Sequence, residues 1–221
     1  MRMRRKKHLE ERLDQVAAQV IQLRVDTIRF DADESPKYLD FGALFGNENP
    51  VEMEIGCGKG GFICQLAARH PEVNFLAVEL YANVLVSACE KAKEMGLTNI
   101  RFLSGNAEYL ERFIPPHSLR RLYLNFSTPF PKKRQATHRL THPHFLEMYK
   151  ELLVPGASVI QKTDGRVFFQ YSLEQMSACG YTLRNISLDL HSDGIEDNIV
   201  TEYESRFVAQ GLPIYRVEAT V

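Results

Sequence analysis

The sequence predicts an α/β fold, built on a mostly parallel seven-stranded sheet with helices on both of its faces. Short apolar runs alternate with stretches of helical spacing from residue 51 to the end of the chain, which is the pattern of successive strand–helix–strand units. The length of 221 residues suits one large core, and 44% hydrophobic with 25% charged residues is typical of a globular chain and excludes a disordered one.

The first element is an amphipathic helix expected near the N-terminus. Leu9, Leu13, Val16 and Val20 recur at helical spacing within a basic segment. We therefore divide the chain into a basic, helical extension over residues 1–24 and a single domain over residues 25–221.

Strands and helices then alternate along the domain. Strands are expected at 51–55, 73–80, 99–103, 119–126, 157–163, 181–190 and 213–221. Helices are expected after the glycine turn to about Arg69, after the second strand to about Gly96, and over 144–154 and 167–179. Ligands of such sheets bind beyond the carboxyl ends of the strands, so functional side chains are expected there.

Several classes of protein are excluded by composition. No apolar run approaches the roughly 20 residues of a transmembrane helix, and the basic N-terminus leads into no apolar signal region. The cysteines Cys57, Cys64, Cys89 and Cys179 show no zinc-ligand spacing. We expect a cytoplasmic protein with reduced thiols and neither a membrane nor a metal as partner.

Charge is distributed unevenly along the chain. Between Arg112 and Leu146 there is no Asp or Glu, whereas seven Lys or Arg and four His residues occur. The rest of the chain carries 20 basic and 28 acidic residues, although the net charge of the whole is only −1. Such a window is what an electrostatic footprint for a polyanion looks like. A solvated basic loop is the alternative.

A glycine-rich turn follows the first expected strand. Gly56, Gly58 and Gly61 form a G-x-G-x-x-G pattern, and Glu79 lies at the next strand end, where an acid binds ribose hydroxyls. This pattern alone fits an NAD-dependent oxidoreductase. Glu54 favours S-adenosylmethionine (SAM), because a carboxylate there suits a cationic amino acid moiety and would repel a pyrophosphate. Glu54 as a plain strand-end acid is the structural alternative.

Three further segments carry polar side chains suited to a site. Asn106 follows the third strand, where its amide can bind adenine or cap the next helix. The segment 124–141, LNFSTPFPKKRQATHRLT, places a proline-aromatic turn directly before a basic cluster, as in enzymes that methylate nitrogen. The segment 198–207, NIVTEYESRF, contains a capping box from Thr201 to Glu204, which leaves the two residues between them available to a base edge.

These segments together resemble the bacterial tRNA (guanine-N7-)-methyltransferases. The resemblance rests on EIGCGKGGF, AVELY, LYLNFSTPFPKKR, HRLTHPHFL, KTDGR, SLDLH, NIVTEYE and QGLPIYR, in order over residues 25–221. It implies a class I SAM-dependent, Rossmann-like fold. The implied activity is methyl transfer from SAM to N7 of a guanosine in tRNA, at position 46 of the variable loop. The implied partner is tRNA, and we expect a monomer or homodimer.

The resemblance also assigns residues. SAM would contact Glu54, Gly56, Gly58, Glu79, Asn106 and Thr128. The substrate would contact Lys132, Asp164, Thr201, Glu202, Tyr203 and Glu204. The RNA backbone would lie against Arg134, Gln135, Ala136, Thr137, His138 and Arg139.

The chain departs from the family at its catalytic position. Where the family reads S-D-P-W-P-K, this chain reads S-T-P-F-P-K, with Thr128 in place of the catalytic aspartate and Phe130 in place of tryptophan. Guanine N7 loses no proton on methylation, so the reaction needs placement and stabilisation of a cationic product rather than a general base. The change predicts a slower enzyme. A tRNA-binding paralogue with impaired catalysis is the alternative.

Overall fold

The computed structural model describes residues 8–17, 20–22, 36–195 and 198–221. These residues form two compact units, one up to Phe113 and the other from Ile114 to the end of the chain. No helix among the described residues is long and apolar enough to cross a membrane.

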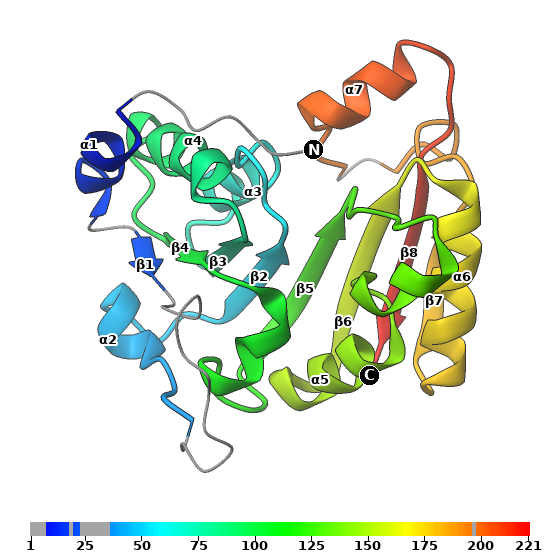
Figure 1. The fold of residues 1–221 in the computed structure, drawn as a ribbon, viewed down its shortest axis with the longest axis horizontal. Helices are drawn as coiled ribbons and strands as arrows, with labels where there is room; N and C mark the ends of the chain where they lie inside the picture. The colour runs from blue at the N-terminus through cyan, green and yellow to red at the C-terminus, as the bar shows by residue number, and fades with distance from the viewer. Residues whose placement is uncertain (1–7, 18–19, 23–35, 196–197) are drawn as a thin grey trace. The chain divides into compact units, whose positions relative to one another are not determined.

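The strands of the first unit run parallel (Figure 1). Their order is β1-β4-β3-β2. The strands are β1 (Val20–Gln22), β2 (Val51–Ile55), β3 (Asn74–Glu79) and β4 (Ile100–Ser104). All of β2 and β3 is buried, as in a parallel strand covered on both faces.

The helices of the first unit connect these strands. They are α1 (Leu9–Asp14), α2 (Phe41–Phe45), α3 (Ile63–Arg69), α4 (Ala82–Glu94) and the 3₁₀ helix η2 (Ala107–Arg112). Asp40 caps α2, where its side chain accepts a hydrogen bond from the backbone N–H of Ala43 at 2.9 Å. Arg12 of α1 donates two 2.6 Å hydrogen bonds to Glu90 of α4, which ties the first helix to this unit.

The second unit contains a mixed sheet. Its order is β5-β6-β8-β7, with β5 and β6 parallel and β8 antiparallel to both of its neighbours. The strands are β5 (Leu119–Asn125), β6 (Leu153–Thr163), β7 (Thr182–Ser187) and β8 (Tyr215–Thr220). The helices are η3 (Lys133–His138), α5 (Pro143–Leu152), α6 (Arg166–Ala178) and α7 (Glu202–Val208).

All seven expected strands are present, together with the short additional strand β1. The N-terminal helix is shorter than its apolar spacing predicts, because α1 ends at Asp14 and Val20 pairs with Phe102 of β4 instead. Val20 is β-branched, which suits a strand better than the end of a helix. The predicted domain boundary between residues 24 and 25 lies outside the described residues.

Candidate functional site

The glycine turn between β2 and α3 has the open backbone that a ligand needs. Gly56 and Gly58 have φ angles of +80° and +57°, and a Cβ built on either would meet no atom within 4 Å. The packing glycine is Gly60 rather than the Gly61 of the literal pattern, because a Cβ on Gly60 would lie 2.9 Å from the Cβ of Ala88 in α4. The turn thus lies tightly against α4 while its outer face stays open.

Two carboxylates flank this turn at the ends of β2 and β3. Glu79 accepts hydrogen bonds from the backbone N–H of Gly58 at 3.1 Å and of Tyr81 at 3.0 Å, so it shapes the turn directly. Glu54 is 2% exposed. Burial raises the pKa of the Cys57 thiol, and the charges of Glu54 and Glu79 raise it further, which reports a negative potential within the turn. Such a potential favours a cation.

Asn106 lies at the start of η2 and acts as its cap. Its side-chain oxygen accepts a hydrogen bond from the backbone N–H of Glu108 at 3.1 Å, and its amide donates to the Glu108 carboxylate at 3.1 Å. The capping alternative is therefore observed. Contact with a bound adenine stays a prediction.

Thr128 lies on the loop that follows β5, with an exposed side chain. The neighbouring Ser127 hydroxyl is buried and has no hydrogen-bond partner within the described part of the chain. Phe130 has a φ of +41°, a conformation that costs a non-glycine residue energy and is held only by its surroundings.

Arg139 supplies that support. Its guanidinium donates to the carbonyl oxygens of Pro129 and Phe130, each at 3.0 Å, and lies 4.3 Å from the ring centroid of Tyr171 on α6. The predicted RNA contact Arg139 is thus engaged with its own loop. Thr137 and His138 are exposed, and Gln135 and Ala136 are half-buried.

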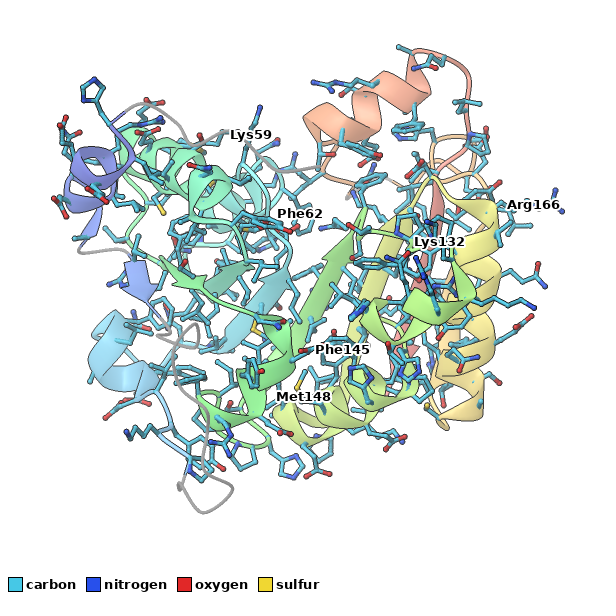
Figure 2. The ribbon with its side chains drawn as sticks, in the orientation of Figure 1. Lys59, Phe62, Lys132, Phe145, Met148 and Arg166 are labelled. Carbon is cyan, nitrogen blue, oxygen red and sulfur yellow. The ribbon has the colours of Figure 1, made fainter. Side chains whose placement is uncertain are left out.

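The cations ahead of Arg139 project into solvent. Lys132, Lys133 and Arg134 are all exposed. Figure 2 labels Lys132 on the loop after β5 and Arg166 at the start of α6, another exposed cation of this unit. No described group of three or more His, Cys, Asp or Glu side chains is arranged to hold a metal ion.

Asp164 and Tyr203 lie near each other in the second unit. Asp164 is half-buried just after β6, and Tyr203 is 46% exposed on α7. Burial raises the pKa of the Tyr203 hydroxyl, and the nearby charge of Asp164 raises it further. The Tyr203 ring lies 5.0 Å from the ring of Phe126, the residue that follows β5. An aromatic face and a carboxylate are thus presented together.

Thr201 and Glu204, the two ends of the predicted substrate segment, are buried. Thr201 is the N-cap of α7 and accepts a hydrogen bond from the backbone N–H of Glu204 at 3.0 Å, as the capping box predicts. The Glu204 side chain is 0% exposed, and its carboxylate binds other residues instead of the Thr201 backbone N–H that a full capping box would use. The side chain of Glu202 lies outside the described residues.

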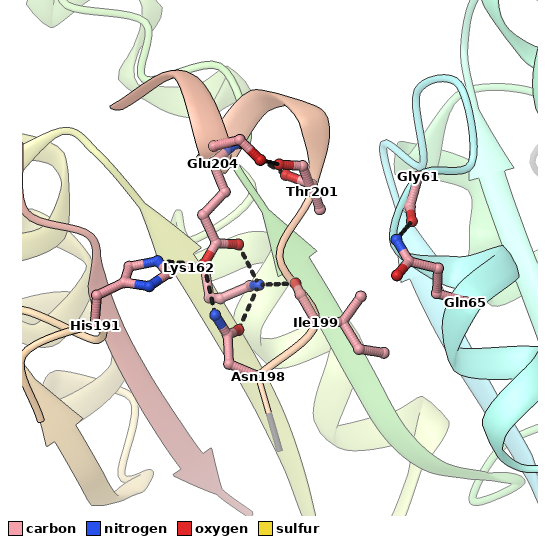
Figure 3. A network of polar contacts seen from close by, with 9 residues as sticks. Gly61, Gln65, Lys162, His191, Asn198, Ile199, Thr201 and Glu204 are labelled. Carbon is pink, nitrogen blue, oxygen red and sulfur yellow. Dashed lines mark hydrogen bonds and ion pairs between the residues drawn. The ribbon is translucent and has the colours of Figure 1, made fainter. Parts of the chain in front are cut away.

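The partners of Glu204 are residues that sequence patterns did not single out. Lys162 of β6 donates a hydrogen bond to the Glu204 carboxylate at 2.8 Å, and His191 contacts the same carboxylate at 2.9 Å (Figure 3). The available signal was a lysine within the expected strand 157–163 of a sheet covered on both faces, since a buried lysine needs an acidic partner. Gln65, in the same view, anchors the glycine turn by donating to the Gly61 carbonyl at 2.6 Å.

Comparison with known proteins first defines the class. A family model described as a putative methyltransferase matches residues 48–217. Among solved structures, an antibiotic-related methyltransferase superposes with a TM-score of 0.61 at 17% identity, over 82% of this chain and 92% of that one. The fold is that of the class I, Rossmann-like methyltransferases, which confirms the predicted fold class.

Sequence relatives narrow this class to one family. The tRNA (guanine-N(7)-)-methyltransferase of Geobacillus kaustophilus is 48% identical over 176 residues, covering 80% of this chain and 81% of that protein. The protein of the same name from Bacillus subtilis is 44% identical over 178 residues, covering 80% and 84%. The chain belongs to the tRNA (guanine-N7-)-methyltransferase family, and the resemblance drawn from its motifs is confirmed.

Proposed function

We propose that this protein transfers the methyl group of SAM to N7 of a guanosine in tRNA, at position 46 of the variable loop. The observation that carries the proposal is the 48% identity to a relative of that name over 80% of the chain. The open glycine turn and the exposed cationic loop supply the two binding surfaces that the reaction requires.

SAM fits the turn between β2 and α3. The space above Gly56 and Gly58 accepts the close approach of a ligand to backbone N–H groups. Glu54 would bind the cationic amino group, Glu79 the ribose hydroxyls through its remaining lone pairs, and Asn106 the adenine. SAM contributes an electrophilic methyl group on a positively charged sulfur.

Guanine is assigned to the locus of Asp164 and Tyr203. The Tyr203 ring would stack on the purine, and the Asp164 carboxylate would accept hydrogen bonds from its Watson–Crick edge. Because N7 carries an in-plane lone pair, no side chain has to remove a proton. The carboxylate also stabilises the positive charge that the purine acquires.

The tRNA backbone is assigned to the cationic loop. Lys132, Lys133 and Arg134 are exposed on a loop whose course Arg139 holds from within. Side chains on a pre-formed loop bind phosphates with less loss of conformational freedom. Arg139 itself therefore acts in this proposal as a support of the loop. The free cysteines support a reducing, cytoplasmic location.

The experiment is nucleoside mass spectrometry of unmodified tRNA after incubation with the protein and SAM. The proposal predicts 7-methylguanosine, and it predicts none in a tRNA whose variable-loop guanosine is replaced by adenosine. Asp164→Asn should lower the yield, whereas the matched change Asp189→Asn, in the turn after β7, should not. Absence of product from every tRNA would overturn the proposal.

A second candidate function rests on Thr128. With no carboxylate at this position, the protein would bind tRNA and SAM without efficient transfer. This outcome is recognised by tRNA binding without 7-methylguanosine. An NAD-dependent oxidoreductase is tested by titrating SAM and NAD separately, and NAD binding alone would support it.

A further inference from the structure

A single buried lysine, Lys162, binds three residues in and just before the first turn of α7. Lys162, near the end of β6, is 4% exposed and donates hydrogen bonds to the Asn198 side chain at 3.0 Å, the Ile199 carbonyl at 3.0 Å and the Glu204 carboxylate at 2.8 Å (Figure 3). The ammonium group has three donors, and each has an acceptor on this segment.

The Glu204 carboxylate is fully used inside the protein. One oxygen accepts from Lys162, and the other accepts from the Asn198 amide at 2.6 Å and from His191 at 2.9 Å. An ionised carboxylate can only accept, so the Nε2 atom of His191 donates. With its side chain 0% exposed, Glu204 presents neither oxygen to a ligand.

Such a cluster contributes geometry more than stability. Removing two charges from water costs about as much free energy as their attraction returns, and an apolar pair of similar size often stabilises a fold equally well. The cluster does hold β6, the loop at Asn198 and the first turn of α7 in one arrangement. The directional, three-way bonding of Lys162 permits little variation in that arrangement.

Next to this cluster lies a row of aromatic rings from Phe126, Tyr203 and Phe207, of which Tyr203 is 46% exposed. Tyr203 adjoins Glu204 in sequence, lies 5.0 Å from the Phe126 ring and continues to Phe207 at 5.0 Å. The ammonium group of Lys162 lies 5.9 Å from the centroid of the Phe126 ring. Lys162 therefore contacts both the anchor of α7 and the ring on which Tyr203 rests.

We propose that Lys162 and His191 are positioning residues for guanine recognition, and that the Glu204 carboxylate is their internal anchor rather than a contact to the base. This inference rests on the proposed function, because it takes Tyr203 and Asp164 as the groups that meet the guanine. Lys162 and His191 act through Glu204 and touch no substrate.

The test is a rescue experiment in the full-length protein. Lys162→Met leaves the Glu204 charge buried beside an apolar side chain, so kcat/KM for tRNA is expected to fall about 100-fold while SAM affinity stays within about twofold. The double variant Lys162→Met, Glu204→Gln removes both charges, and its amide can donate to the acceptors that Lys162 leaves behind. The double variant should regain at least about tenfold of the lost kcat/KM.

Recovery distinguishes an anchor from a base contact. If Glu204 bound the guanine directly, the double variant would be no better than either single variant, and that result, in a folded protein, would overturn the inference. A conservative pair tests His191 in the same way: His191→Ala should lower kcat/KM and His191→Gln, which keeps a donor, should restore it. The control is Lys150→Met with Glu147→Gln, an ion pair on α5 whose side chains are 33% and 58% exposed and which should change neither parameter.

A spectroscopic reading separates this inference from the proposed function. The chain contains no tryptophan, so Phe207→Trp introduces a single fluorophore that reports the packing of α7 against Tyr203. Lys162→Met should shift its emission to the red, and the double variant should reverse the shift. An emission unaffected by Lys162→Met would refute the positioning role. Absence of methylation by the wild-type protein would refute the proposed function.

Discussion

Glu79 offers the most direct test of the proposed cofactor site, because it stabilises the glycine turn through two backbone hydrogen bonds and is also the proposed ribose ligand. It is 9% exposed and accepts hydrogen bonds from two backbone N–H groups, at 3.1 Å from Gly58 and 3.0 Å from Tyr81. A hydrogen bond to a charged group contributes about 1.5–3 kcal/mol. Glu79→Ala should therefore lower the free energy of unfolding by about 3 kcal/mol or more.

The same substitution should weaken SAM binding beyond its effect on stability. For a protein of this size about 3 kcal/mol corresponds to a fall in Tm of about 6–12 °C. Loss of the ribose acceptor adds about 1.5–3 kcal/mol to the free energy of SAM binding, which is a rise in Kd of about 10- to 100-fold. Differential scanning calorimetry measures the first effect, and isothermal titration calorimetry at a temperature where the variant is folded measures the second.

The matched control is Glu94→Ala, an exposed carboxylate at the end of α4. Its effect on stability should stay within about 0.5 kcal/mol, and its SAM affinity should equal that of the wild type. If Glu79→Ala lowers Tm but binds SAM with the wild-type Kd, Glu79 does not bind the ribose of SAM. An unchanged Tm would refute the stabilising role of the two backbone hydrogen bonds.

Three further changes probe other parts of the molecule. Thr128→Asp restores the carboxylate of the family and should raise single-turnover methylation of tRNA by about tenfold or more, since it would add negative charge at the position that the resemblance places beside the cationic product. No gain between about pH 6 and 8 would show that Thr128 does not limit the rate. Lys133→Ala with Arg134→Ala should weaken binding to every tRNA and lower the slope of log K against log salt by about 0.7–0.9 per lost phosphate contact. Filter binding at several salt concentrations measures this slope. A slope equal to that of the wild type would show that these side chains contact no phosphate. Burial raises the pKa of Cys64 and of Cys89 to about 12, whereas unfolded thiols ionise at about 8.5, so stability should fall as pH rises from about 8.5 towards 12. Urea unfolding of the Cys64→Ala, Cys89→Ala variant should show a smaller alkaline loss than the wild type, and an equal loss would exclude these thiols as the cause.

Features that depend on neighbours in sequence were predicted well. The strand, glycine turn and helix around Gly56 follow from local backbone preferences, and Glu79 follows from the length of one strand–helix–strand unit. Thr201 was correctly placed as an N-cap because capping involves atoms only three residues apart. Each of these inferences needs only the chain within about one strand–helix–strand unit.

Features that depend on distant partners were missed. The carboxylate of Glu204 binds Lys162, 42 residues earlier, and no local rule selects that partner over the cap. The family resemblance predicts that Arg139 contacts RNA, and that contact stays a prediction. No local rule indicated that its guanidinium donates to two carbonyl oxygens of its own loop and lies against the Tyr171 ring. The glycine that packs against Ala88 is Gly60, which the literal G-x-G-x-x-G pattern does not include, because this close approach depends on how α4 packs.

The pairing of β1 with β4 bears on how the protein can be shortened. Backbone groups of residues 20–22 occupy the edge of β4, in register with Phe102, Leu103 and Ser104. A chain begun at residue 25, where the family resemblance starts, would leave that row of N–H and C=O groups without its strand. An uncovered edge of this kind recruits strands from other molecules. Residues 20–22 thus cover this edge of β4, and a chain that lacks them is expected to self-associate.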